Sequence, residues 1–189
     1  NNTYLLSVNP FPILPTHLTI ISDRHCRQTI TAQRLEDMAY MARHLEGFLV
    51  FFNGACSGAS APDHFHFQAV PNELVPLTAW DSQTQLHLGV QNCEAGRVKV
   101  DHDKSDYCNI LCWNTADGLR WWVVRRRQHR PWQYAAEGDA KVLISPAALE
   151  FAGVVPLARE EDFDKMDSPL LTDIFSQCRK SEPYVDVGL

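Results

Sequence analysis

The stretch at residues 64–68, His-Phe-His-Phe-Gln, constrains the fold more than any other part of this chain. Successive side chains of an extended strand point to opposite faces of a sheet, so His64, His66 and Gln68 share one face. Phe65 and Phe67 share the other face and can bury in a core. The alternation predicts a β-strand that is packed on one side and carries two imidazoles and a carboxamide on the other.

A loop of small residues precedes this strand, reading Asn-Gly-Ala-Cys-Ser-Gly-Ala-Ser-Ala-Pro-Asp over residues 53–63. Small side chains let backbone N–H groups approach a ligand closely. A polar row without acidic side chains, placed beside such a loop, suits a phosphate ester. We therefore expect the chemistry of the chain at this row.

The hydrophobic pattern predicts an α+β fold with a mostly antiparallel sheet flanked by helices. Strands are expected at residues 4–8, 18–21, 48–52, 107–113, 119–126 and 141–144, with weaker candidates at 86–90 and 96–100. Helices are expected at 31–46, 146–151 and 160–178, and Pro169 interrupts or opens the second piece of the last one.

The length of 189 residues suits a single domain, 1–189, with an active-site half at 1–80 and a second half at 81–189. A faint internal repeat relates the hairpin from Tyr4 to His25 to the hairpin from Tyr107 to His129. A degenerate tandem duplication would explain this likeness, and so would chance in a β-rich chain.

The net charge of −6 argues against nucleic-acid binding, which needs a positive footprint. The sequence has no apolar run long enough to span a membrane and no signal-peptide pattern, so we expect a cytoplasmic protein without membrane contact.

The six cysteines are scattered, which favours free thiols in a reducing compartment. Cys108 and Cys112 would share one face of a predicted strand. A zinc ion there would need two more ligands, and His102 with Asp101 or Asp103 lies nearby. Buried thiols are the favoured interpretation, so we expect no metal site.

Within the polar row, His66 is the expected nucleophile. A neutral imidazole nitrogen attacks phosphorus, and a covalent intermediate divides one transfer into two displacements. The other ring nitrogen should then donate to a backbone carbonyl. The amide N–H of Gln68 can stabilise charge on the phosphoryl oxygens, but Gln68 cannot act as an acid or base, which favours transfer over hydrolysis. His64 could orient the substrate; the alternative for the whole row is the solvent face of an edge strand.

A basic run extends from Arg120 to Arg130. Arginine binds phosphate with bidentate geometry, and Arg127 is the best single candidate for contacting a phosphate chain. The alternative is a solvated strand end whose charges protect a sheet edge. His17 and His25 belong to the first hairpin and its end. They could approach the site, but we expect them to have a structural role rather than a catalytic one.

These residues resemble the histidine-triad (HIT-like) superfamily, in its transferase branch. The resemblance rests on the hairpin at residues 9–21, the helix at 31–46, and the sequence from Asn53-Gly54 to His64-Phe65-His66-Phe67-Gln68. The triad hydrolases carry a third histidine in place of Gln68. The His-x-His-x-Gln form is similar to diadenosine tetraphosphate phosphorylase, GDP-L-galactose phosphorylase and galactose-1-phosphate uridylyltransferase.

The resemblance implies that His66 is nucleotidylated, that Gln68 holds the α-phosphate, and that Asn53 and Ser60 contact the nucleotide. Gly58, in the same loop, is expected to border the phosphate. Two features depart from the family: the zinc-binding Cys-x-x-Cys of the uridylyltransferases is missing, and family members carry sequence ahead of the first hairpin that has no counterpart here.

The expected function is that of a nucleotidyltransferase or phosphorylase acting on a nucleotide diphosphate, polyphosphate or nucleotide sugar, with phosphate or a sugar phosphate as acceptor. The sequence identifies no certain cofactor, although a divalent cation is possible, and exposed strand edges make a homodimer possible. The alternatives are a triad-type hydrolase and a non-catalytic nucleotide-binding module.

Overall fold

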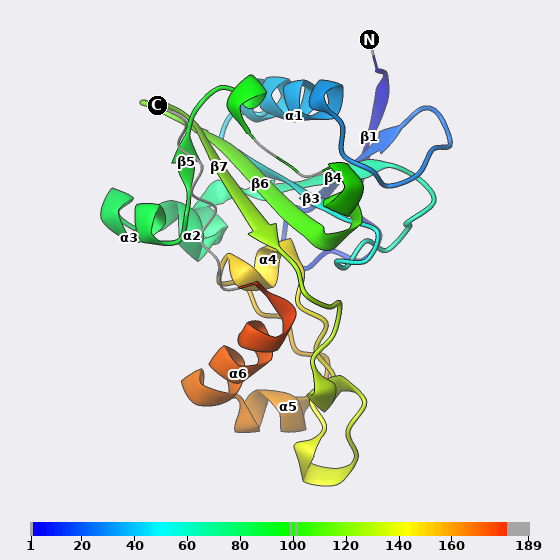
Figure 1. Ribbon diagram of the computed structural model, residues 1–189, viewed down its shortest axis with the longest axis vertical. Coiled ribbons are helices and arrows are strands. Elements are labelled where there is room, and N and C mark those ends of the chain that lie inside the picture. Colours follow the sequence, from blue (N-terminus) through cyan, green and yellow to red (C-terminus); the bar gives the residue numbers. More distant parts are fainter. Residues whose placement is uncertain (1, 99, 101, 181–189) are drawn as a thin grey trace.

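The computed structural model describes residues 2–98, 100 and 102–180, and the strands of this part form one antiparallel sheet (Figure 1). The strand order across the sheet is β1-β2-β4-β3-β6-β7-β5, which confirms the expected α+β fold. The strands are β1 (Tyr4–Val8), β2 (Leu18–Ser22), β3 (Phe48–Asn53), β4 (His66–Pro71), β5 (Gln91–Asn92), β6 (Cys108–Thr115) and β7 (Gly118–Arg125).

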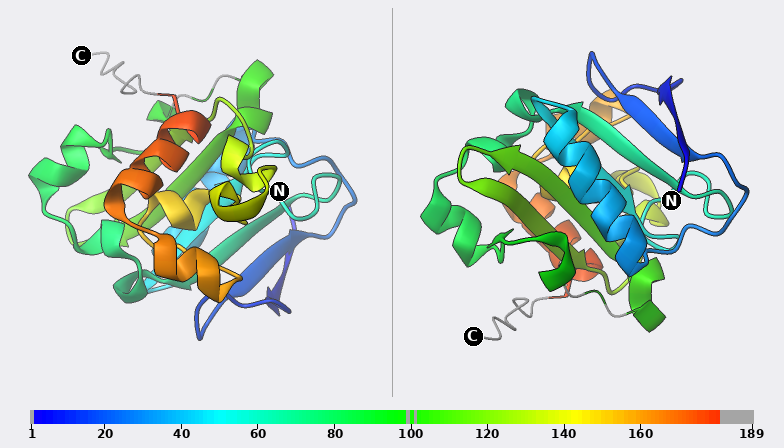
Figure 2. Two further views of the ribbon diagram at one scale, coloured as in Figure 1. Left: turned by 90° about the horizontal axis from the view of Figure 1, so that it is seen from below. Right: turned by 90° about the horizontal axis from the view of Figure 1, so that it is seen from above.

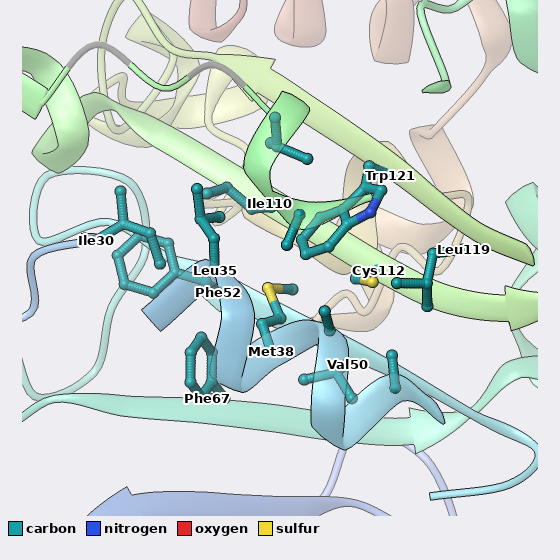
Figure 3. Packing of buried hydrophobic residues seen from close by; sticks show 14 of the residues in the cluster. Ile30, Leu35, Met38, Val50, Phe52, Phe67, Ile110, Cys112, Leu119 and Trp121 are labelled. Atoms are coloured by element: carbon teal, nitrogen blue, oxygen red, sulfur yellow. The ribbon is translucent and has the colours of Figure 1, made fainter. Parts of the chain in front are cut away.

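Helix α1 (Ala32–His44) covers one face of this sheet. The helix begins after Thr31, whose side chain accepts a hydrogen bond from the backbone N–H of Arg34 at 3.2 Å, as an N-cap does. Its buried face packs on side chains from the sheet, and Figure 3 shows Met38 between Val50 and Phe67. The phenylalanine face of the alternating stretch is therefore buried in the core, as the pattern predicts.

The opposite face of the sheet is covered by the segment that follows β7 (Figures 1 and 2). Leu149 and Phe151 belong to the same buried core as Leu49, Leu111 and Trp122 of the sheet. Seen from below, the β1–β2 hairpin extends past these helices, so this sheet face is only partly covered (Figure 2). The helices of the segment are α4 (Ala148–Phe151), α5 (Glu160–Lys165) and α6 (Ser168–Cys178).

The structure corrects the weaker strand predictions. Residues 86–90 are not a strand, because Asp81 caps a helix by accepting from the N–H of Thr84 at 3.0 Å. The described residues of the range 96–100 form no strand either; a 3₁₀ helix occupies Ala95–Arg97, and residue 99 lies outside the described residues. Between β4 and β6, the sequence also did not predict strand β5, helices α2 (Pro76–Ala79) and α3 (Ser82–His87), or the 3₁₀ helices Asn72–Leu74, Ala95–Arg97 and His102–Tyr107.

Residues 141–144 are also not a strand. Val142 and Ile144 bury against Ile174 of α6, and the N–H of Leu143 donates to the carboxylate of Asp162 at 2.9 Å. That hydrogen bond takes the place of a ladder partner. Two more 3₁₀ helices, Trp132–Tyr134 and Gly138–Ala140, precede this segment.

Cys108 and Cys112 are buried free thiols in β6, and burial raises the pKa of Cys108 to about 12. Among the described side chains, no group of three or more His, Cys, Asp and Glu residues could hold a metal ion. The further zinc ligands considered above, Asp101, His102 and Asp103, lie outside the described side chains. No helix in the described part of the chain is long and apolar enough to cross a membrane.

Candidate active site

Strand β4 places His66 and Gln68 on one face of the sheet, and Phe67 on the other. The register pairs His66 with Ile21 and Gln68 with Thr19 of β2, and Gln68 also pairs with Phe51 of β3. The strand begins at His66 rather than at residue 64. The backbone N–H of His64 donates to the carbonyl of Ala61 at 3.2 Å, so His64 lies in a turn just before the strand.

Two adjoining cavities open on the face that carries His66 and Gln68. One, of about 340 Å³, is bordered by His64, His66 and Gln68 and is called the His66 chamber here. The other, of about 380 Å³, is bordered by Asn53, Gly58, Gln68 and Arg130 and is called the Arg130 chamber. Four residues line both chambers, namely Asn9, Phe11, Ser60 and Gln68.

The two ring nitrogens of His66 have different environments. Nδ1 lies 2.9 Å from the backbone carbonyl oxygen of His64. A carbonyl only accepts, so Nδ1 carries the proton and donates it to this bond. Nε2 is buried and has no hydrogen-bond partner within the described part of the chain. Burial lowers the pKa of His66, so the ring is neutral and Nε2 holds a free lone pair.

The backbone of His66 is fixed by a buried side chain, Gln28, which is fully inaccessible to solvent. Its carboxamide oxygen accepts from the N–H of His66 at 2.8 Å. Its nitrogen donates to the carbonyls of His66 and Asn53 at 2.9 and 3.0 Å. The carboxamide of Gln28 therefore makes the hydrogen bonds that a backbone peptide group would make. It joins the end of β3 to the start of β4, where the two strands no longer pair with each other.

The orientation of the Gln68 carboxamide is set by His17. Ile13 donates its N–H to Nδ1 of His17 at 3.2 Å, so Nε2 carries the proton and donates to Oε1 of Gln68 at 2.7 Å. Nδ2 of Asn9 donates to the same oxygen at 3.3 Å. The nitrogen of Gln68 consequently points away from these donors and is free to donate to a ligand. Burial lowers the pKa of His17, which keeps this arrangement neutral.

Asn53 is oriented in the same way by a second set of donors. Its Oδ1 accepts from Nδ2 of Asn109 at 2.7 Å and from the N–H of Ala148 at 3.1 Å. With the oxygen occupied, the amide nitrogen of Asn53 is the group left for the Arg130 chamber. Two carboxamides, Gln68 and Asn53, thus present N–H donors to the cavity, which suits phosphoryl oxygens.

The small-residue loop is held against both β6 and the segment before α4. Gly58 has a φ of +99°, and a Cβ there would lie 2.6 Å from the Cβ of Ala147. The hydroxyl of Ser57 donates to the carbonyl of Asp106 at 2.9 Å. Ser60 stays exposed and borders both chambers. The loop therefore needs glycine where its backbone approaches the wall of the cavity.

The arginine that the sequence favoured does not reach the cavity. Arg127 is exposed, lines neither chamber, and donates its backbone N–H to the carbonyl of Cys178 at 2.9 Å. Arg126 is buried, and its guanidinium donates to Oδ1 of Asn109 at 2.7 Å and to the carbonyl of Ser57 at 3.3 Å. Arg130 lines the chamber instead.

Two further polar side chains border the Arg130 chamber. His129 has its Nε2 at 2.9 Å from the hydroxyl of Ser145, and burial lowers the pKa of this histidine. Glu150 accepts the N–H of Ala147 at 2.8 Å, and burial raises the pKa of its carboxyl group. Sequence reasoning assigned no role to these residues, since the contacts that gather them join distant parts of the chain.

The fold is similar to that of known solved structures, which confirms the expected resemblance at the level of the fold. Solved structures of yeast Ap4A phosphorylase Apa2 show this likeness. The complex with AMP is 19% identical to this chain at a TM-score of 0.62, over 93% of this chain and 73% of that one. The free enzyme is 18% identical at a TM-score of 0.64, over 93% and 74%.

The complex of Apa2 with Ap4A gives the same result, at 18% identity and a TM-score of 0.62 over 93% of this chain and 73% of that one. Residues 1–71 match the model of a domain of unknown function, DUF4922. No curated protein matches the chain by sequence. The DUF4922 match ends with β4 and thus includes the whole alternating strand.

Proposed function

We propose that this protein is a nucleotidyltransferase of the phosphorylase type that works through a covalent nucleotidyl-His66 intermediate. The observation that carries the proposal is the buried Nε2 atom of His66, which is unprotonated and without a partner in the described part of the chain. A buried polar atom normally has a partner, and one that lacks it at a cavity marks a place where a ligand atom binds.

In the first step, the lone pair of Nε2 attacks the α-phosphorus of the substrate. The P–N bond forms while the bond from phosphorus to the leaving phosphate oxygen breaks, and that oxygen keeps the electron pair. The Nδ1 proton stays on the hydrogen bond to His64, so the positive charge of the phosphorylated ring faces a carbonyl dipole. The leaving phosphate is a stable anion and needs no proton from the protein.

In the second step, an oxygen of the acceptor attacks the same phosphorus. A new P–O bond forms, the P–N bond breaks, and His66 returns to its neutral state. Gln68 and Asn53 donate to the phosphoryl oxygens in both steps through amide nitrogens that their other partners leave free. Ser60 and the backbone near Gly58 border the same phosphate, and His64 supports the His66 ring through its carbonyl.

The proposed substrates are nucleotide diphosphates, polyphosphates and nucleotide sugars, and the acceptor is phosphate or a sugar phosphate. The solved complexes of Apa2 hold AMP and Ap4A, which makes Ap4A a suitable first probe for this chain. We treat residues 1–189 as one domain with its active-site half at 1–80. A cytoplasmic location, a homodimer and a tandem duplication stay predictions.

The test is intact-mass spectrometry after mixing the protein with Ap4A, nucleoside diphosphates and nucleotide sugars in turn. One of them is expected to add the mass of a nucleoside monophosphate less water. His66→Asn, which keeps a donor for the His64 carbonyl, is expected to form no adduct. His87→Asn is the matched control, because His87 is an exposed histidine of α3 that lines neither chamber.

Product formation by His66→Asn at the normal rate would refute the covalent mechanism. The same assay separates the other candidate functions. Full-rate release of nucleoside monophosphate without phosphate would identify a hydrolase. Nucleotide binding without adduct or turnover would identify a binding module.

A further inference from the structure

The relation between the two chambers gives the direction of group transfer, if the proposed function holds. The phosphorus under attack must lie within reach of Nε2 of His66 and of the Gln68 amide, which places it where the chambers meet. In a phosphoryl transfer the attacking and leaving atoms lie roughly in line, on opposite sides of phosphorus. His66 attacks from its own chamber, so the leaving group departs on the side of the Arg130 chamber.

The two chambers also differ in chemistry. The His66 chamber has apolar walls made by Val8, Pro10, Phe11 and Ile21, which suit the flat face of a base. The Arg130 chamber has a cationic and hydrogen-bonding wall that comes from a distant part of the sequence. The nucleoside therefore fits the first chamber, and a charged group fits the second.

The cationic wall is held in place by packing. The guanidinium of Arg130 stacks over the ring of Tyr134 at 4.0 Å, which restricts its rotamers before any ligand binds. Nearby, His129 and Ser145 are hydrogen-bonded to each other at 2.9 Å. One member of this pair keeps a proton to donate to a ligand: the Ser145 hydroxyl if Nε2 of His129 is protonated, or Nδ1 of His129 if it is not. Together with the guanidinium of Arg130, this donor matches phosphate oxygens.

The buried guanidinium of Arg126 adds positive charge next to the cationic wall of the Arg130 chamber. Arg126 is 1% exposed, and it donates to the carbonyl oxygens of Gln128 and His129 at 3.1 Å each. These bonds tie the segment that carries Arg130 to the sheet. The carboxyl group of Glu150 also borders the chamber, but burial raises its pKa and its Oε2 is engaged by the N–H of Ala147.

We propose that the Arg130 chamber is an anion subsite, in which Arg130 and the hydrogen-bonded pair of His129 and Ser145 bind the phosphate group that leaves in the first step. The acceptor phosphate enters the same subsite in the second step and attacks from there. The subsite thus favours phosphate over water as the acceptor, which is the property that makes a phosphorylase rather than a hydrolase.

The first experiment measures binding of inorganic tripolyphosphate to the unmodified full chain by calorimetry. Arg130→Gln is expected to weaken binding by about tenfold or more, the usual effect of removing one charged hydrogen bond. Arg127→Gln is the matched control, since it removes an exposed arginine three positions away and should bind as the wild type does. Absence of wild-type binding, or equal losses in the two variants, would overturn the proposal.

The second experiment starts from the nucleotidylated protein, freed of substrate, and follows the loss of adduct mass at increasing inorganic phosphate. Arg130→Gln is expected to need about ten times more phosphate for half-maximal discharge, while discharge by water stays unchanged. If discharge of the Arg130→Gln adduct depended on phosphate concentration as the wild-type adduct does, the proposed subsite would be wrong. If no adduct forms in any protein, the covalent mechanism fails, and the binding experiment still decides whether the chamber takes an anion.

Discussion

The Nε2 atom of His17 lies 2.7 Å from Oε1 of Gln68, so a buried imidazole in the first hairpin loop decides which end of a carboxamide faces the cavity. The tautomer follows from the N–H of Ile13, which donates to the other ring nitrogen. Without His17, the two orientations of the Gln68 amide would be closer in energy, and one of them would point an oxygen at the phosphate.

The first prediction concerns this contact. His17→Leu is expected to slow adduct formation at His66 by about tenfold, because part of the population loses a donor to the transferred phosphoryl group. His17→Gln, which keeps an N–H donor near Gln68, should recover much of the rate. Stopped reactions read by intact mass give the rates. Equal rates for His17→Leu and the wild type would show that the amide holds its orientation without this partner.

The second prediction concerns pH. Burial lowers the pKa of His66 below its reference value of 6.5, so the ring stays neutral in mildly acidic solution. As the pH is lowered, the rate of adduct formation is therefore expected to fall to half its maximum only below pH 6.5. A midpoint above 6.5 would mean that the nucleophile is not a buried neutral imidazole.

The same pKa shift affects stability. The unfolded chain takes up a proton at His66 near pH 6.5, whereas the folded chain resists it. The stabilising contribution is thus complete above pH 6.5 and is lost as the pH falls below it, by up to about 1.4 kcal/mol per pH unit. Urea unfolding at pH 7.5 and 5.5 should show a smaller loss for His66→Asn than for the wild type.

The third prediction concerns Gln28. Gln28→Leu leaves the N–H of His66 and two carbonyls without partners, which should lower the free energy of unfolding by about 2–4 kcal/mol. Gln83→Leu, at an exposed position, is the control and should change it by less than about 0.5 kcal/mol. Chemical denaturation gives both values. If Gln28→Leu left the free energy of unfolding unchanged, water would have to replace the hydrogen bonds of this side chain.

The fourth prediction compares two glycines. Gly47 and Gly58 both have positive φ, at +77° and +99°, but only a Cβ at Gly58 meets another residue, Ala147. Gly47→Ala should therefore lower the free energy of unfolding only by the backbone strain, about 1 kcal/mol. Gly58→Ala should cost about 1–2 kcal/mol more, because it also displaces the loop from Ala147. Equal losses of stability in the two variants would mean that the loop around Gly58 can move away from Ala147 without cost.

Local patterns predicted much of the fold. Alternation placed His66 and Gln68 on the open face, and the hydrophobic pattern predicted the helix at 31–46 that the structure shows as α1. The predicted strand at 141–144 was wrong because burial there is satisfied by α6, and a short apolar run has the same appearance in either case. Residues that pack locally were predictable; residues whose partners are distant were not.

The candidate site shows this limit more clearly. Gln28 is separated from His66 by 38 residues, and Asn109 from Asn53 by 56. Nothing near Gln28 or Asn109 in the sequence indicates a buried hydrogen-bond network, because each partner arrives only when the sheet is assembled. The sequence favoured Arg127, whereas Arg130 lines the chamber. Strand alternation could not distinguish them, because the chain leaves β7 before either arginine.

The DUF4922 match stops at the end of β4, whereas the wall that carries Arg130 and Ser145 begins after β7. His66 and the side chains of this wall thus belong to separate stretches of the chain. Under the proposed function, substitutions in the later stretch would change which anion accepts the nucleotide and would leave the strand that carries His66 unaltered.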